Sequence, residues 1–145
     1  MTKQTLKGSC LCGALKFVVT GEPTRFYHCH CSRCRKFTGS AHASNILINP
    51  EFFEWLDGED QVGRFEHPEA KHFATCFCKR CGSSLPWLGK SGATIVIPAG
   101  TLDDDPGVRT AAHIFVASKA PWVEIGDDCP QFDEYPPGFD PSAES

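Results

Sequence analysis

Nine cysteines constrain the fold of this 145-residue chain more than any other feature. Eight fall in three clusters: Cys10 and Cys12; Cys29, Cys31 and Cys34; and Cys76, Cys78 and Cys81. Cys129 stands alone. Within a cluster the spacings are one or two residues, at which a metal ion can join two thiolates but a disulfide would usually be strained. The pattern therefore predicts metal ligands rather than disulfides.

The start of the chain favours the same interpretation. MTKQTLKGSC lacks the apolar run of a secretory signal, and no stretch of the sequence approaches the roughly 20 apolar residues of a membrane span. We therefore expect a cytoplasmic protein with no membrane partner. Cytoplasmic thiols stay reduced and remain available to bind metal.

Composition and charge narrow the classes of protein further. Hydrophobic residues make up 41% of the chain and charged residues 22%, which is ordinary for a folded protein and too apolar for a disordered one. The formal net charge of -4 provides no basic field to hold a phosphate backbone. We therefore expect a small-molecule partner and no nucleic acid.

The hydrophobic pattern predicts an all-β fold. Leu15, Phe17 and Val19 alternate with other residues and should share one face of a strand. The candidate strands are Ala14–Val19, Thr24–Cys29, Ser44–Ile48, Val62–His67, Lys71–Cys78, Ala93–Pro98 and Ala111–Val116. Pro50–Leu56 is expected to form one helical turn. We predict a single domain over residues 1–128, followed by a proline-rich tail, 129–145, that covers the domain or is disordered.

Two of the clusters can form a closed metal site. Cys10 and Cys12 need two further ligands, and Cys78 and Cys81 are the best candidates because each of these pairs ends in Cys-Gly, as in zinc-ribbon corners. Four thiolates leave no room for substrate, so this site predicts a structural zinc that ties distant segments together. The alternative is a set of buried free thiols.

The remaining cluster offers three thiolates, from Cys29, Cys31 and Cys34. Three protein ligands and one open position are typical of catalytic zinc, and an ion so rich in sulfur suits thiolate chemistry better than hydroxide formation. Alternatively, a fourth residue closes the site and makes it a second structural centre. The candidates for that fourth ligand are Cys76, His28, His30 and His42.

Spacing alone leaves one ambiguity between the clusters. Cys76, Cys78 and Cys81 repeat the C-x-C-x-x-C spacing of residues 29–34, so either triad could be the complete one. In an extended strand His28 and His30 point away from the side that Cys29 and Cys31 face. They are expected to be packing or surface residues.

The order of these motifs resembles that of the glutathione-dependent formaldehyde-activating (GFA) family. The segments that carry the resemblance are GSCLCGA at 8–14, CHCSRCRK at 29–36, FCKRCGS at 77–83 and HIFVASKAPW at 113–122. The match extends from residue 8 to about residue 135. Cys76 and Cys129 lie outside the family's seven-cysteine pattern.

The resemblance implies a zinc-stapled fold of several short, coiled antiparallel sheets with two zinc ions per chain. It implies that Cys10, Cys12, Cys78 and Cys81 bind the structural zinc and that Cys29, Cys31 and Cys34 bind the catalytic zinc. The implied activity is that of a carbon–sulfur lyase of the S-(hydroxymethyl)glutathione synthase type, which joins a thiol such as glutathione to formaldehyde or another small aldehyde. The alternative function is a non-catalytic zinc-binding module.

Overall fold

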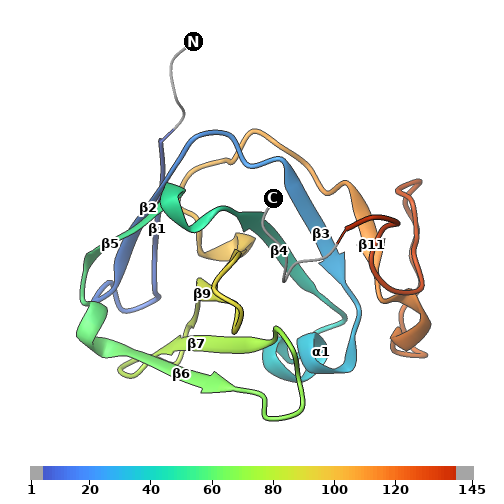
Figure 1. The fold of residues 1–145 in the computed structure, drawn as a ribbon, viewed down its shortest axis with the longest axis horizontal. Helices are drawn as coiled ribbons and strands as arrows, with labels where there is room; N and C mark the ends of the chain where they lie inside the picture. Colours follow the sequence, from blue (N-terminus) through green and yellow to red (C-terminus); the bar gives the residue numbers. More distant parts are fainter. Residues whose placement is uncertain (1–4, 140–145) are drawn as a thin grey trace.

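Residues 5–139 are described by a computed structural model, and they form three small β-sheets and one short helix (Figure 1). The first sheet has the order β1-β2-β5, from Thr5–Ser9, Lys16–Thr20 and Phe53–Asp57. The central sheet has the order β11-β3-β4-β10-β9, from Ala112–Ile114, Arg25–Cys29, Ala43–Ile48, Ile95–Pro98 and Trp87–Leu88. The third has the order β6-β7-β8, from Val62–Glu66, Ala74–Cys78 and Ser84–Leu85. The mostly-β prediction is confirmed.

Alternation correctly identified the strand that carries the first sheet's core. Leu15, Phe17 and Val19 are all buried, and Phe17 and Val19 join Leu6 and three isoleucines from β4 and β10 in one hydrophobic cluster. This cluster lies between the first and central sheets. Burial of each such side chain stabilises the fold by about 1.5–3 kcal/mol relative to an exposed one.

The helical turn expected over Pro50–Leu56 is only partly present. Pro50–Phe52 forms a single 3-10 turn (η1), which Asn49 caps by accepting a hydrogen bond from the Glu51 amide. β5 then begins at Phe53. Phe53 and Trp55 alternate along β5 and both contact the Phe17 ring, so aromatic packing across the sheet overrides the local helical preference.

The helix α1 (Ser32–Thr38) begins directly after Cys31 and contains Cys34. Its N-cap is Cys31, whose sulfur accepts a hydrogen bond from the Cys34 amide at 3.3 Å. Gly39 ends it in the left-handed conformation, with its amide bonded to the Arg35 carbonyl. Only Cys34 is buried, so the helix carries no apolar stripe that sequence periodicity could detect.

One pairing differs from the expected antiparallel pattern, because β11 pairs with β3 in parallel. The long chain segment between these strands permits a parallel return. The register places Ile114 beside Cys29 and His113 beside His28. β11 therefore forms a wall next to the three-cysteine cluster.

The described part of the C-terminal segment, up to residue 139, lies against this same edge. The Phe132 amide donates to the His113 carbonyl, and the Val116 amide donates to the Phe132 carbonyl. Tyr135 and Phe139 pack edge to face, and Phe139 also contacts Tyr27 of β3. The division into 1–128 and 129–145 stays a prediction, and residues 140–145 lie outside the described range.

Within residues 5–139 no helix is both long and apolar enough to cross a membrane.

Candidate metal centres and the adjoining cavity

The first centre joins two turns that are far apart in the sequence. Cys10 and Cys12 follow β1, and Cys78 and Cys81 lie at and after the end of β7. The four sulfur atoms all lie within 4.8 Å of one another. Gly13 and Gly82 have φ values of 80° and 76°, which allows each turn to fold back sharply beside its cysteines.

The donor set and its spacing fit a tetrahedral zinc ion. Zinc–sulfur bonds of about 2.3 Å place the sulfurs of a tetrahedral site about 3.8 Å apart. The Cys10 and Cys12 sulfurs are 3.6 Å apart, and those of Cys12 and Cys78 are 3.8 Å apart. Backbone amides of Leu15 and Arg80 donate to sulfur at 3.3 and 3.4 Å, as amides around metal thiolates do. The cluster can therefore hold a metal ion with all four positions filled by protein.

Two thiols of this cluster, those of Cys81 and Cys10, have a lowered pKa. Hydrogen bonds from Ser83, first its hydroxyl and then its amide, lower the pKa of Cys81 to about 5. Burial raises the pKa of Cys10, but hydrogen bonds from Leu15, Cys12 and Cys78 outweigh this and leave it lowered. Thiolate is the form that binds metal.

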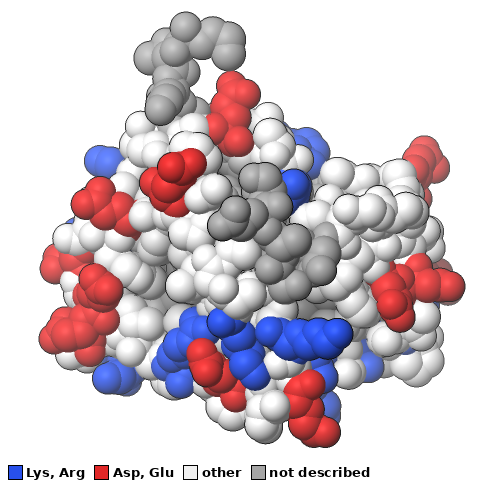
Figure 2. Space-filling model, viewed as in Figure 1, with Lys and Arg blue, Asp and Glu red and all other residues white. Residues whose placement is uncertain are grey.

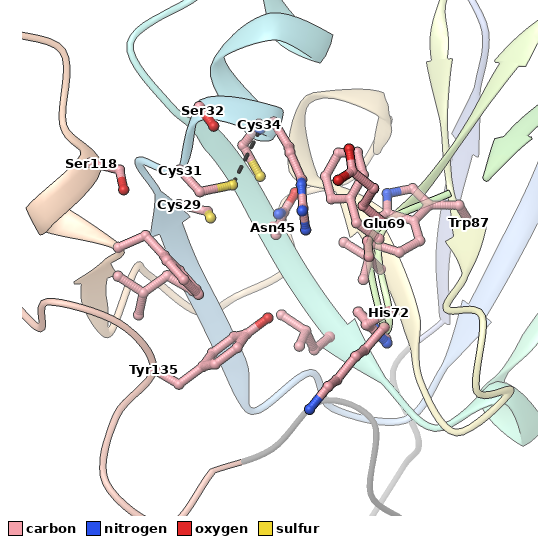
Figure 3. Close-up of a pocket in the computed structure, with 18 residues that line it drawn as sticks. Cys29, Cys31, Ser32, Cys34, Asn45, Glu69, His72, Trp87, Ser118 and Tyr135 are labelled. Atoms are coloured by element: carbon pink, nitrogen blue, oxygen red, sulfur yellow. Dashed lines mark hydrogen bonds between the residues drawn. The ribbon is translucent and has the colours of Figure 1, made fainter. Parts of the chain in front are cut away.

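The second centre lies where β3 runs into α1. The sulfurs of Cys29, at the end of β3, Cys31, at the helix N-cap, and Cys34, in the helix, all lie within 4.8 Å of one another (Figure 3). Hydrogen bonds from Cys29 and then Cys34 lower the pKa of Cys31 to about 3, whereas the pKa of Cys34 is raised by its hydrogen bonds to Cys29 and Cys31 and by burial. Cys31 is therefore the thiol that ionises more readily than Cys34.

Among the described residues, no fourth cysteine, histidine or carboxylate joins the second cluster. Cys76, on β7 of the third sheet, is buried in a hydrophobic cluster, and its sulfur lies 4.0 Å from Nη1 of Arg64. Cys129 lies apart, beside the Thr110 carbonyl. His28 and His30 point to the other side of β3, as expected from strand alternation, and pack with His42. None of the four predicted alternatives closes the site.

A cavity of about 620 Å³ opens directly onto the three sulfurs. Figure 3 shows Tyr135 and His72 across the cavity from the cysteines, with Glu69 and Trp87 along one side. Much of the lining is apolar: Leu47, Ala70, Phe73, Trp87, Val96, Ile114 and Phe115. The remaining polar groups come from Ser32, Arg33, Asn45, Lys71 and Ser118. The arrangement suits a ligand with an apolar part and a few polar groups.

Charge near the cavity is unevenly distributed. On the face drawn in Figure 2, lysine and arginine side chains gather over α1 and the β6–β7 hairpin, while acidic side chains lie mostly toward the edges. Arg33 and Lys71 both line the cavity, and Glu69 is its acidic member. This local basic field can attract an anionic ligand although the chain is acidic overall.

Several lining residues had no signal in the sequence. Asn45 and Trp87 come from strands of the central sheet, and Tyr135 comes from the segment expected to be a tail. Only tertiary packing brings them to one cavity. The aromatic pair Tyr135 and Phe139 within the proline-rich segment is the feature that could have indicated a packed rather than loose segment.

The fold and the two cysteine clusters define a mostly-β protein with two sites capable of binding metal. The model of the glutathione-dependent formaldehyde-activating enzyme family matches residues 5–118, and the chain belongs to this family. A Halomonas elongata protein named "Putative glutathione-dependent formaldehyde-activating enzyme" is 32% identical over 130 residues, covering 83% of this chain and 80% of the relative. The resemblance inferred from the cysteine motifs is confirmed.

A crystal structure of a Rhodobacter sphaeroides protein shares the fold. It superposes with a TM-score of 0.57 at 21% identity, covering 71% of this chain and 90% of the other.

Proposed function

We propose that this chain is a cytoplasmic, zinc-dependent enzyme that adds a thiol, glutathione or a similar one, to formaldehyde or another small aldehyde. Cys29, Cys31 and Cys34 hold the reactive zinc, and Cys10, Cys12, Cys78 and Cys81 hold a structural zinc. In the reaction the thiol sulfur bonds to the carbonyl carbon and the thiol proton passes to the carbonyl oxygen. The product is a hemithioacetal, and the reverse reaction is that of a carbon–sulfur lyase.

The observation that carries the proposal is the contrast between the two clusters. One has four thiols and the other has three thiols facing a cavity, without a fourth protein ligand among the described residues. Three protein ligands with an exchangeable fourth position are what catalytic zinc sites have in common. A zinc ion there supplies a Lewis acid and lowers the pKa of a thiol that enters the open position.

The chain's own side chains account for binding and orientation. Arg33 and Lys71 offer cations to the carboxylates of a thiol such as glutathione. Asn45 and the Tyr135 hydroxyl lie across the cavity from one another, where they can hydrogen-bond to a carbonyl or amide. The apolar wall around Phe73 and Trp87 limits water around the reacting sulfur.

The test is hemithioacetal exchange measured by NMR with glutathione and formaldehyde. Because the uncatalysed condensation is itself fast, the spontaneous exchange rate is the baseline and a modest acceleration is expected. Cys34→Ala should reduce the exchange to that baseline. Lys71→Ala should weaken glutathione binding while leaving exchange of a small uncharged thiol unchanged.

The non-catalytic zinc module is the competing function. It would be supported by wild-type protein that accelerates exchange of no thiol and aldehyde pair, combined with zinc bound at both clusters by four protein ligands.

A further inference from the structure

A group of four histidines lies behind the three-cysteine cluster, on the opposite side of β3 from the cavity. His28 and His30 alternate with Cys29 and Cys31, so imidazoles point to one side and thiols to the other. The His28 ring stacks on His42 with centroids 4.1 Å apart, and it meets His113 edge to face at 5.1 Å. The proposed function assigns no role to this group.

Two of the rings are linked by a direct hydrogen bond. Nε2 of His30 lies 2.9 Å from Nδ1 of His113, and the two residues are 0% and 3% exposed. On the far side of His113, Nε2 lies 2.9 and 3.1 Å from the two oxygens of Asp127. A continuous chain of hydrogen bonds therefore runs from the half-exposed Asp127 to the ring between Cys29 and Cys31.

The carboxylate determines which nitrogen of each ring carries hydrogen. An ionised carboxylate only accepts, so His113 must donate from Nε2. In the neutral ring Nδ1 is then an acceptor, and His30 must donate to it from its own Nε2. Nδ1 of His30, which is buried and has no hydrogen-bond partner, is left as the nitrogen without hydrogen. The carboxylate of Asp127 therefore determines the tautomer of His113 and, through it, the tautomer of His30.

The chain of bonds also fixes the position of the cluster. The His30 amide donates to the Ile114 carbonyl at 2.9 Å, so both its backbone and its ring are held by β11 and the residues around it. The His42 ring packs edge to face against the His30 ring with centroids 5.0 Å apart, and His30 is fully buried. Any shift of His30 moves the flanking residues Cys29 and Cys31 with it.

We propose that Asp127 and His113 are positioning residues that hold His30, and through it Cys29 and Cys31, in the geometry needed to bind the reactive metal. The link between this role and catalysis rests on the proposed function. The positioning itself concerns metal binding, and it can be tested without turnover.

Asp127→Asn is the informative variant. Oδ1 of Asp127 also accepts from the Cys129 amide at 3.0 Å, and an asparagine can keep that bond through its own oxygen. The asparagine NH₂ group then takes the place of Oδ2, which at 2.9 Å is nearer to Nε2 of His113 than Oδ1 is at 3.1 Å. Two donors would face each other there, so we expect Nε2 to become an acceptor. The hydrogens of both rings should move to Nδ1. Asp128→Asn is the matched control, because Asp128 is the neighbouring exposed acid.

Nitrogen-15 NMR of the histidine rings measures whether Asp127 determines their tautomers. Wild-type protein and Asp128→Asn should show Nε2–H on both His30 and His113. Asp127→Asn should show Nδ1–H on both rings. Asp127→Glu, which keeps a carboxylate, should restore Nε2–H. A wild-type spectrum with any other assignment overturns the proposal, even if the variant fails to fold. So does an Asp127→Asn spectrum identical to that of the wild type.

Cobalt titration measures whether the chain of hydrogen bonds affects metal binding at the three-cysteine cluster. In Asp127→Asn, Co²⁺ affinity at the three-cysteine cluster should fall roughly tenfold and its sulfur-to-cobalt bands should shift, with the four-cysteine cluster unchanged. Cys34→Ala identifies which bands belong to the three-cysteine cluster. Altered ring tautomers with unaltered cobalt binding would show that the chain of bonds does not position the cluster. Absence of hemithioacetal exchange would contradict the proposed function and leave this result standing.

Discussion

At the scale of single residues, a glycine in β1 leaves room for an aromatic ring of β2. Gly8 of β1 lies opposite Phe17 of β2, and a Cβ at Gly8 would stand only 2.1 Å from the Phe17 ring. The ring fills the space that a side chain would take, and it packs further against Phe53 and Trp55. A glycine inside a strand is usually unfavourable, and here the close approach of the ring explains it.

Gly8→Ala should therefore destabilise the protein. Displacing a fully buried Phe17 costs about 1–3 kcal/mol, as other overpacked cores do. Gly100→Ala is the control, because nothing lies within 4 Å of a Cβ there and its φ is not positive. Urea unfolding of the zinc-loaded proteins measures both, and equal midpoints for the two variants would contradict the packing argument.

The histidine group should make stability depend on pH. Burial, with a further contribution from His113, lowers the pKa of His42 despite an opposing contribution from the Ala43 backbone. The unfolded chain, whose histidine pKa is about 6.5, then binds the proton more readily than the folded one. The contribution of neutral His42 to the free energy of unfolding is therefore fully present above about pH 6.5, and it is lost as the pH falls below that value.

His42→Gln should accordingly flatten the decline of unfolding free energy below about pH 6.5. Urea unfolding at several pH values measures the slope, with the zinc content of both proteins determined at each pH so that metal loss is separated from ring protonation. An unchanged slope would show that His42 does not contribute to it.

Elements differ in how far the sequence could predict them. β2 was predictable because Leu15, Phe17 and Val19 alternate, and the four-cysteine centre was predictable because its two turns carry matching Cys-Gly signals. β1 was not predicted, since Leu6 is its one fully buried apolar side chain. α1 was also missed, because a seven-residue helix with only Cys34 buried has no periodic pattern.

The two centres should respond differently when one ligand is removed. Cys81 closes the link between the β1–β2 turn and the end of β7, so Cys81→Ser should unfold the protein or make it insoluble. Structural zinc contributes roughly 10–16 kcal/mol of apparent binding free energy in small peptides, which is comparable to the stability of a whole domain.

Cys34→Ala should instead remain folded, because the four-cysteine centre is intact, and it should lose only the metal at the second cluster. Circular dichroism, thermal unfolding and elemental analysis distinguish the two variants. If both unfold alike, the second cluster is a structural centre as well.

At the scale of the whole molecule, the cavity results from contacts that no local pattern reveals. Its wall combines Cys29 of β3, Trp87 of β9 and Phe73 before β7 with Tyr135 of the C-terminal segment. The sequence could predict the cysteine clusters, because each short motif places two or three cysteines within a few residues of one another. It could not predict the residues that face the cysteines, because these come from separate parts of the chain that only tertiary packing brings together.

The central claim is that the cysteine cluster at β3 and α1 keeps one metal position for an exchangeable ligand. Zinc X-ray absorption on protein loaded with two ions, before and after saturation with a small thiol, tests it most directly. The seven cysteines that cluster here predict seven sulfur ligands and at least one lighter ligand over the two ions, rising to eight sulfurs when the thiol is added. Four protein ligands at both ions, with no change on adding thiol, would contradict the claim.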